Sequence, residues 1–491
     1  MPDLTRVPDL AKVSDLAKAP DLTKAPDLTG APDLILKNGH IVTPTTTYLG
    51  DIIVKDGIIA AITAPGSVTT HPDKTTRIID ATGKYIFPGL IDPHVHLNAS
   101  LGTGRDIHDF YSASVMAAFG GVTSFIDFSE TERGQSPLEA IKIRKSQMTD
   151  CAIDYSMHAV FVEAPEDFLA EIKEIVDFGC PSIKMFTTYE NLKITDPEII
   201  AVMEESARSG ALPIFHAEND AIAERLRRRH IKEGKLHWRY FPESKPNICE
   251  EEAVSRVISY AKHTGCPLHI FHLTTEEGLG VIAAAQKAGV DVTAETCPHY
   301  LMFTKEKNSN EDGYLYIMSP PLRGQKDQDA MWRGLANGTI SNVGSDNCTF
   351  SREMKYAENY THVLNGVTGM EERIHVLTAE GINKNRISYN KLCEITSYNP
   401  AKIFGLYPQK GAIQPGSDAD FMIYDPAKPG VVTPKTMHQL IDYNIYNGLQ
   451  TKGWPIMTIR RGEIIVESGE FKGKKGSGRF LARRPYARLF T

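Results

Sequence analysis

Pro88-Gly89-Leu90-Ile91-Asp92-Pro93-His94-Val95-His96 is the stretch around which the rest of this chain can be interpreted. Side chains two residues apart on a β-strand point to the same face, so His94 and His96 would share one side. The stretch is rich in Leu, Ile and Val and is punctuated by Pro and Gly, which is typical of a buried strand entered from a turn. Two imidazoles that converge at a strand end could bind one metal ion. Because two ordinary histidines would give the same pattern, the metal interpretation depends on whether ligand-type residues recur at later strand ends.

The composition is that of a soluble globular protein large enough for two domains. The 491 residues are 41% hydrophobic and 23% charged, with a formal net charge of −7. This mild charge gives no reason to expect nucleic acid or a membrane as a partner, and no apolar run approaches the ~18 residues of a membrane span. Seven cysteines without a CxxC pair, and no visible secretory signal, favour free thiols in a cytoplasmic protein.

Both ends of the chain differ from its middle. Residues 1–31 contain a six-residue repeat, with PDL at 2, 8, 20 and 26 and SDL at 14. The recurring proline excludes a continuous helix and the apolar content is too small for a core, so this segment is predicted to be a flexible extension. Short strand patterns with turn residues occupy 32–86 and return at 412–470. We predict that these two segments form one small β-sandwich domain, followed by a C-terminal tail at 471–491.

The segment between them, residues 87–411, alternates strand-like and helix-like patterns. The strand candidates are Leu90–Leu97, Val122–Phe128, Asp154–Phe161, Ser182–Thr187, Leu212–His216, Leu268–Leu273, Asp291–Glu295 and Ser341–Ser345. Helical patterns include Pro165–Phe178, Pro197–Ser209, Glu250–Thr264 and Thr275–Ala288. Alternating β and α favours a parallel sheet. Eight units favour an α/β fold of the (β/α)8 TIM-like barrel type, whose active site lies at the C-terminal ends of the strands.

Ligand-type residues do recur at the ends of later strands: Lys184, His216, His272 and Asp346. Each alone has an ordinary explanation, but with the two histidines of the first strand they bring six such residues to one rim. Lys184 is informative because an apolar strand should not bury an ammonium, and a buried lysine can lose its proton. Its neutral amine could add carbon dioxide and become a carbamate, an anion able to bridge two cations. A lysine paired with a carboxylate is the alternative.

Several motifs in the right order make the chain resemble the cyclic amidohydrolases, and within them dihydropyrimidinase and D-hydantoinase. The motifs are PGLIDPHVHL, GGVTSFIDF, SIKMFTTY, FHAEN, IFHLTT, ETCPHYL, MSPPLR, GSDNCTF, LNGVTGMEER, NPAKIFGL and GSDADFMIYDP. The resemblance covers about residues 33–482 and leaves the N-terminal repeat outside. It implies a homotetramer that acts on a small cyclic amide.

The resemblance also implies a centre of two Zn²⁺ ions per subunit. The ligands would be His94, His96, Lys184, His216, His272 and Asp346. The first two histidines and the aspartate would bind the more buried ion, and the other two histidines would bind the second. The lysine, as N6-carboxylysine, would bridge both ions together with a hydroxide. This hydroxide would attack a ring amide carbon, and Asp346 would pass its proton to the leaving nitrogen.

Further positions match substrate-binding residues of the family. By resemblance, the Tyr189 hydroxyl would hydrogen-bond the oxyanion of the tetrahedral intermediate, while Ser319 and Asn365 would hold the ring through backbone groups. The expected reaction opens 5,6-dihydropyrimidines or 5-substituted hydantoins to N-carbamoyl amino acids. The loop after His96, residues 97–104, lacks the acidic residue and the Met-Pro-Phe-Gly-Gly-like sequence of hydantoinases, which leaves the substrate less defined than the catalytic core.

Other interpretations stay open. An allantoinase-like or imide-hydrolysing enzyme is the first alternative, whereas Asn98 argues against dihydroorotase, which has an arginine at this position. A non-catalytic dihydropyrimidinase-related scaffold would have lost metal ligands that are intact here. A thiol enzyme could use Cys348, but no GxSxG elbow frames a nucleophile. Glu218 and His299, near strand ends, are expected to support the site or to be structural, and Asn347 stands where relatives commonly have histidine.

Overall fold

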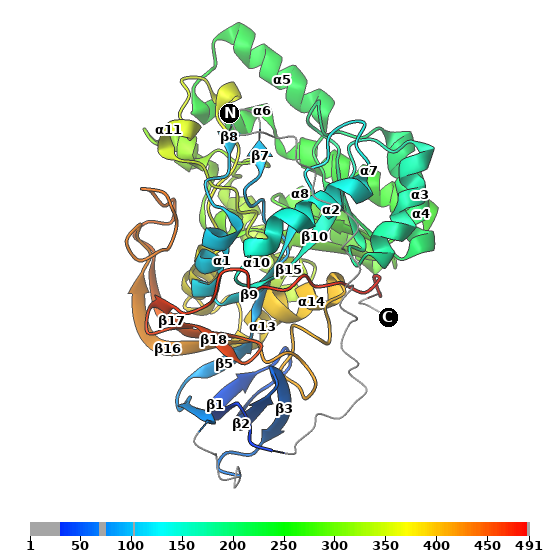
Figure 1. The fold of residues 1–491 in the computed structure, drawn as a ribbon. Coiled ribbons are helices and arrows are strands. Elements are labelled where there is room, and N and C mark those ends of the chain that lie inside the picture. The colour runs from blue at the N-terminus through cyan, green and yellow to red at the C-terminus, as the bar shows by residue number, and fades with distance from the viewer. Residues whose placement is uncertain (1–29, 68–74, 102–103, 489–491) are drawn as a thin grey trace, which may run out of the picture.

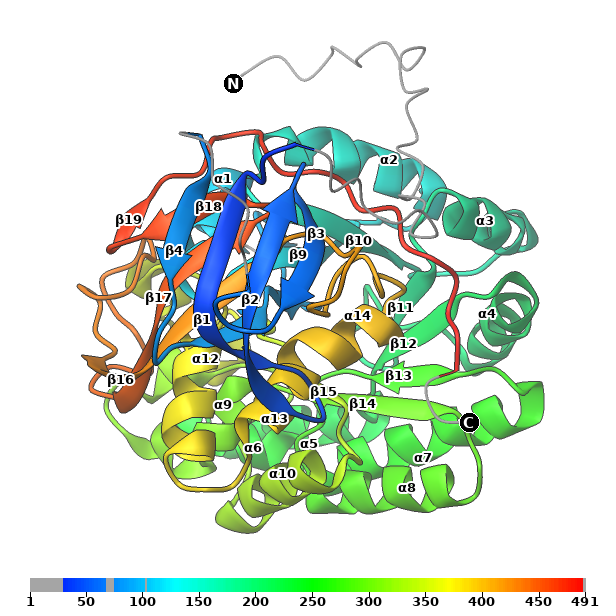
Figure 2. The ribbon, with the colours of Figure 1, turned by 90° about the horizontal axis from the view of Figure 1, so that it is seen from below.

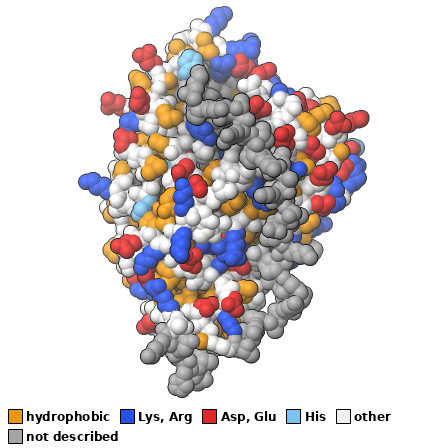
Figure 3. Space-filling view, viewed as in Figure 1, with side chains coloured by type: hydrophobic (Ala, Val, Ile, Leu, Met, Phe, Trp, Pro, Cys, Tyr) orange, Lys and Arg blue, Asp and Glu red, His pale blue; other side chains and the backbone are white. Residues whose placement is uncertain are grey.

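The computed structural model describes residues 30–67, 75–101 and 104–488. All but the last two residues of the predicted N-terminal extension therefore lie outside the described residues. Figure 1 shows a helix-covered barrel above a sheet formed by both ends of the chain. Acidic and basic side chains are interspersed over the face in Figure 3. Among the residues that the structure describes, no helix combines the length and apolar character needed to cross a membrane.

Eight parallel strands form a nearly closed barrel, as predicted. In chain order they are β6 (Leu90–Asp92), β9 (Val122–Phe128), β10 (Asp154–Val160), β11 (Ser182–Phe186), β12 (Leu212–His216), β13 (Leu268–Ile270), β14 (Val292–Thr296) and β15 (Asn342–Val343). Almost all their residues are buried, because parallel strands in such folds are covered on both faces and read as continuous apolar runs.

The first strand is shorter than predicted, which corrects the placement of two site residues. β6 ends at Asp92, so His94 and His96 lie beyond the regular strand. Pro93 lacks an N–H and cannot continue the ladder. Past the strand ends, the barrel closes through Asp346 N–H donating to His94 O and His96 N–H donating to Asn347 O, each at 2.9 Å. The two histidines are thereby fixed against the segment that carries Asp346.

Helices cover the outside of the barrel (Figure 1). The longer ones are α1 (Phe110–Phe119), α2 (Pro137–Gln147), α3 (Glu166–Asp177), α4 (Asp196–Ser209), α5 (Asp220–Glu233), α7 (Asn247–Thr264), α8 (Glu276–Lys287) and α10 (Gln325–Asn337). The shorter ones are α6 (Phe241–Ser244), α9 (Pro298–Met302), α11 (Arg352–Lys355), α12 (Glu372–Val376), α13 (Tyr389–Cys393) and α14 (Asn399–Ile403). All four predicted helices are confirmed, each with at least one end shifted by one to three residues. The bounds of α4 follow from a capping box of Thr195 and Glu198 and from Gly210, whose φ of 77° suits a helix C-terminus.

The predicted β-domain from both chain ends is confirmed as one mixed sheet of nine strands. Its strands are β1 (Leu34–Val42), β2 (Thr47–Lys55), β3 (Ile58–Thr63), β4 (Arg77–Asp80), β5 (Tyr85–Pro88), β16 (Phe421–Val431), β17 (Gln450–Arg460), β18 (Glu463–Glu467) and β19 (Glu470–Phe471). β5 joins the two ends of the chain because it pairs parallel with β1 and antiparallel with β16. Leu36, Ile52 and Phe421 belong to a core separate from that of the barrel.

A buried ion cluster connects the sheet to the barrel. The Lys410 ammonium lies 2.7 Å from Asp154 on β10, 2.9 Å from Asp418 and 2.6 Å from Asp420, next to β16. Its side chain is only 1% exposed. Three carboxylates around one buried cation hold the pKa of Lys410 above its usual value, although burial opposes this. The guanidinium of Arg461 also pairs with Asp154, so two cations serve the junction and Lys410 is the one shared by all three aspartates.

The C-terminal segment follows the lower end of the barrel. Figure 2 shows it passing along the edge beside α2, α3 and α4. Leu481 N–H donates to Tyr155 O at 2.7 Å, near the start of β10. Arg483 is buried, and its guanidinium donates to Met157 O at 2.6 Å and Ser182 Oγ at 2.7 Å. The segment thus lies opposite the rim at which the predicted ligands lie. The domain limits predicted from the sequence remain a proposal.

Candidate active site

The predicted histidine ligands form a continuous row at the C-terminal rim of the barrel. Ring centroids are 5.4 Å apart for His96 and His94, 5.4 Å for His94 and His272, and 4.4 Å for His272 and His216. These residues come from the ends of the first, fifth and sixth barrel strands, so the row exists only when the barrel is formed. The structure therefore brings together all four histidines selected from the sequence.

Asp346 lies at one end of this row. Its Oδ1 is 3.0 Å from His94 Nε2 and 3.4 Å from His96 Nε2. Burial favours the neutral acid, but the two histidines outweigh it and hold the pKa of Asp346 well below its usual range. Asp346, His272 and Tyr189 all have positive φ values, of 50°, 39° and 73°. Such strained backbone in non-glycine residues is concentrated at functional sites.

Glu295 orients His94 and was not selected from the sequence. Its Oε1 accepts a hydrogen bond from His94 Nδ1 at 2.6 Å, and its Oε2 accepts one from Asn342 at 2.7 Å. Burial alone would lower the pKa of His94, but Asp346 and Glu295 raise it to about 9. Carboxylates commonly orient metal-binding histidines in this way, leaving the other nitrogen for the ion. A buried glutamate that ends the seventh predicted strand was the available signal.

Lys184 is buried among aromatic rings. Its Nζ lies 4.7 Å from the Phe271 centroid, 4.8 Å from Phe186 and 5.5 Å from Phe128. Two of these rings stack on the histidines that follow the first strand, with centroid distances of 4.0 and 4.4 Å. Burial lowers the pKa of Lys184 to about 7. Asp346 and Glu295 oppose this effect of burial only in part, and Lys184 is in no ion pair among the described residues, so the paired-lysine alternative finds no support.

The predicted substrate residues lie beside the second half of the row. The Tyr189 ring centroid is 5.1 Å from that of His216. Ser319 is half-buried and Asn365 is exposed. Gly366, which follows Asn365, donates its N–H to Ile317 O at 3.3 Å. The two segments predicted to hold the ring by backbone groups are therefore neighbours in the structure.

A cluster of ion pairs next to His216 was only partly predicted from the sequence, which indicated Glu218 but not Lys245. Glu218 Oε2 lies 2.8 Å from His216 Nε2 and 2.7 Å from Lys245 Nζ. Lys245 also donates to Ser319 Oγ at 2.6 Å. Burial lowers the pKa of His216 to about 4, with Glu218 opposing this only in part. Lys245 lies in the connection between α6 and α7, where no periodic pattern marks it as functional.

The donor set fits a metal ion. Ligand atoms of His94, His96 and Asp346 lie within 4.8 Å of one another, and the atoms of Cys297 and His299 do so with Asp346. The buried His272 Nδ1 has no hydrogen-bond partner among the described residues. Imidazole nitrogen and carboxylate oxygen are ligands that zinc accepts. This rim could therefore hold a metal ion.

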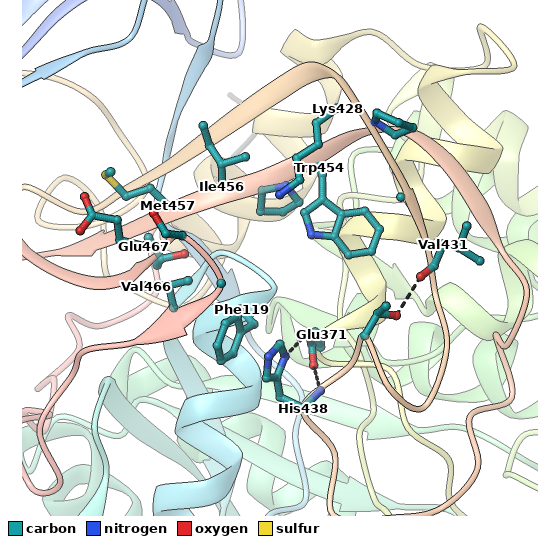
Figure 4. Close-up of a pocket in the computed structure, with 17 residues that line it drawn as sticks. Phe119, Glu371, Lys428, Val431, His438, Trp454, Ile456, Met457, Val466 and Glu467 are labelled. Atoms are coloured by element: carbon teal, nitrogen blue, oxygen red, sulfur yellow. Dashed lines mark hydrogen bonds and ion pairs between the residues drawn. The ribbon is translucent and has the colours of Figure 1, made fainter.

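A surface groove of about 670 Å³ lies apart from the rim, beside β17 and β18. Figure 4 shows Trp454, Met457 and Val466 on its wall and His438 joined to Glu371 at its base. Both hydrogen bonds of that pair measure 2.8 Å. None of the predicted site residues is among those that line this groove, so it is distinct from the candidate active site.

Comparison with known proteins decides the family. Residues 85–465 match the model of the Amidohydrolase family. The chain belongs to the amidohydrolase family. A D-hydantoinase of Ralstonia pickettii is 36% identical over 460 residues, which cover 92% of this chain and 99% of that protein. A crystal structure of dihydropyrimidinase from Brevibacillus agri matches with a TM-score of 0.90 and 34% identity, covering 92% of this chain and 99% of that one.

A third amidohydrolase shows how wide the similarity is. The L-hydantoinase of Arthrobacter aurescens matches with a TM-score of 0.85 and 31% identity, covering 92% of this chain and all of that one. The resemblance recognised in the motifs and the barrel fold are thus confirmed. The roles of individual residues in this amidohydrolase remain predictions.

Proposed function

We propose that this amidohydrolase is a binuclear zinc hydrolase that opens the ring amide of 5,6-dihydropyrimidines or 5-substituted hydantoins to N-carbamoyl amino acids. The observation that carries the proposal is the convergence of His94 and His96 on one oxygen of Asp346 at the barrel rim. The relatives named D-hydantoinase and dihydropyrimidinase support the substrate class. As the resemblance implies, we also propose a homotetramer, testable by light scattering of the purified protein; the cytoplasmic location favoured by the cysteine usage is likewise a proposal.

The proposed ligand set assigns a role to each of the six residues selected from the sequence. His94, His96 and Asp346 would hold one ion, His216 and His272 the second, and N6-carboxylated Lys184 would connect them. A bound pair of divalent ions polarises a carbonyl group and lowers the pKa of water. Lys184 fits this role because its buried amine has a lowered pKa of about 7 and only a neutral amine adds carbon dioxide.

The remaining steps belong to side chains and backbone groups. Asp346 accepts the proton of the attacking water and donates it to the leaving ring nitrogen. Burial raises the pKa of Tyr189, so its hydroxyl stays protonated at neutral pH and donates a hydrogen bond to the oxyanion. Ser319 and Asn365 hold the ring through backbone groups, which makes substitution of their side chains milder than substitution of the metal ligands.

Substrate hydrolysis tests the proposal directly. Dihydrouracil and hydantoin are offered separately to the zinc-loaded protein, and loss of ring absorbance is followed with and without a chelator. Turnover that the chelator abolishes supports the proposal and ranks the two rings. Turnover only of allantoin or a cyclic imide would move the substrate to the allantoinase-like or imide-hydrolysing alternative. Two bound zinc ions without turnover of any cyclic amide would contradict the proposal, and absence of metal would favour a scaffold.

A further inference from the structure

We propose that Lys245 is a positioning residue that donates a hydrogen bond to the Tyr189 hydroxyl and so strengthens the hydrogen bond which that hydroxyl gives to the reacting oxygen. The inference rests on the proposed function, in which Tyr189 faces the oxyanion. It adds to the reaction a residue that lies outside the metal ligands, in the connection between α6 and α7.

The surroundings of Lys245 use two donors of its ammonium group and leave the third for Tyr189. Its Nζ lies 2.7 Å from Glu218 Oε2 and 2.6 Å from Ser319 Oγ. It lies 4.8 Å from the centroid of the Tyr189 ring, so that its third donor is within reach of the hydroxyl on that ring, and each of the two groups shifts the pKa of the other. An ammonium has three donors and no acceptor, so the oxygen of Tyr189 accepts and its own proton stays available.

The charge of Lys245 is secured by its neighbours. Its side chain is 12% exposed, and that of Glu218 is fully buried. Burial would lower the pKa of Lys245, but Glu218 and Tyr189 outweigh it, so that the pKa lies above its usual value. Lys245 is therefore an ammonium at neutral pH. Arg323 Nη1 also donates to the carbonyl oxygen of Lys245, which fixes the backbone at this point.

A cation at this position makes the Tyr189 hydroxyl a stronger hydrogen-bond donor. A hydroxyl that accepts a charge-assisted hydrogen bond becomes a stronger donor, because linked hydrogen bonds polarise one another. Lys245 lowers the pKa of Tyr189, whereas burial raises it by more, so the hydroxyl keeps its proton. The group then donates to an oxygen on which negative charge develops, where such donors have their largest effect.

The competing explanation is that Lys245 only neutralises Glu218. Glu218 also contacts His216, so that role would appear as altered metal content or stability and not as a change in Tyr189. The two explanations therefore differ in which measured quantity responds to substitution. A double-mutant cycle between Lys245 and Tyr189 separates them.

The cycle uses the zinc-loaded full chain with Lys245→Met, Tyr189→Phe and the double variant. We expect Lys245→Met to lower kcat by about 10-fold or more, with KM changed by less than about 3-fold and metal content unchanged. The double variant should be as slow as Tyr189→Phe alone. Lys245→Arg retains a cation and should recover part of kcat. Independent, multiplicative losses, or a loss explained by metal content, would overturn the proposal.

A second measurement needs no substrate and is made on the zinc-loaded protein. 3-Fluorotyrosine placed at position 189 titrates at a lower pH than tyrosine, and its ¹⁹F shift reports ionisation of this one phenol. Removal of the cation by Lys245→Met should raise the titration midpoint, and Lys245→Arg should leave it nearer the original value. An unchanged midpoint in Lys245→Met would refute the contact. If the unmodified enzyme hydrolyses no cyclic amide, the proposed function fails, while this titration still tests Lys245.

Discussion

Replacement of Lys184 tests the centre of the proposed site. Burial among three phenylalanine rings lowers its pKa from 10.5 to about 7. A shift of this size corresponds to about 5 kcal/mol between the charged and neutral forms. At pH ~7.5 the neutral fraction rises from about 0.1% for an ordinary lysine to about 75%. We therefore expect Lys184 to add carbon dioxide near neutral pH, and Lys184→Ala to lose both metal and activity.

The assay follows the reloading of metal-free protein with zinc, with and without bicarbonate, over a range of pH. Recovery of two ions should require bicarbonate and should increase with pH, because the neutral amine forms as pH rises through about 7. Lys184→Arg retains a cation but cannot form the carbamate, so it should stay inactive. Lys355 is a matched control: it is buried, burial lowers its pKa to about 7, and it donates to Ile317 O at 2.7 Å.

Three results would refute this reasoning. One is metal recovery that is independent of bicarbonate. Another is a recovery midpoint near that of an ordinary lysine, which would mean that the aromatic surroundings do not favour the neutral amine. The last is a Lys184→Ala protein that binds two zinc ions with full activity. Loss of the bicarbonate dependence in Lys355→Arg would show instead that the wrong lysine had been assigned.

Three further predictions concern other parts of the molecule. Asp346→Asn should lower kcat by at least about 100-fold because the amide cannot accept and return the proton; turnover close to that of the unchanged enzyme would contradict its role. Lys410→Met removes the cation shared by three aspartates, of which Asp154 keeps Arg461 as a partner, and should lower the free energy of unfolding by about 3–5 kcal/mol in urea, whereas Lys384→Met, at an exposed side chain, should change it little. Glu372 is buried and its pKa is raised to about 7, mainly by burial and then by Glu371. The stability that protonated Glu372 contributes is present below its unfolded pKa of about 4.5 and is lost as pH rises through about 7. The free energy of unfolding therefore falls between these two pH values, and Glu372→Gln should remove up to about 3 kcal/mol of that fall. Equal pH profiles of the unchanged protein and the variant would contradict this.

The barrel could be predicted because its strands are short apolar runs that alternate with amphipathic helices. The histidines, Lys184 and Asp346 could then be selected because they lie at the ends of those runs, without knowledge of any distance. The prediction failed in detail at the first strand, where Pro93 ends the ladder after Asp92, and at the sixth, where β13 ends at Ile270 and leaves His272 beyond it. Backbone hydrogen bonds to Asp346 and Asn347 hold the two histidines after the first strand instead, and no local pattern encodes such a long-range contact.

Residues that orient or pair with other site residues were harder to predict from the sequence. Glu295 ends a predicted strand, but an acidic residue at that position has no partner until the barrel brings His94 to it at 2.6 Å. Lys245 lies between two helices, and its contacts with Glu218 and Ser319 come from distant parts of the chain. The charge and chemistry of a side chain indicate a candidate site residue in the sequence, whereas its role depends on which residues it contacts in the folded protein.

The position of β5 between β1 and β16 has a consequence for synthesis on the ribosome. β5 is complete at Pro88, but the strand that covers its other edge begins only at Phe421. At typical translation rates of about 5–20 residues per second, that edge waits roughly 20–70 seconds for its partner. An unpaired strand edge is a template for wrong pairing with another chain. Nascent chains of this protein should therefore be clients of chaperones for as long as the barrel is being made, and fragments that end before residue 421 should aggregate.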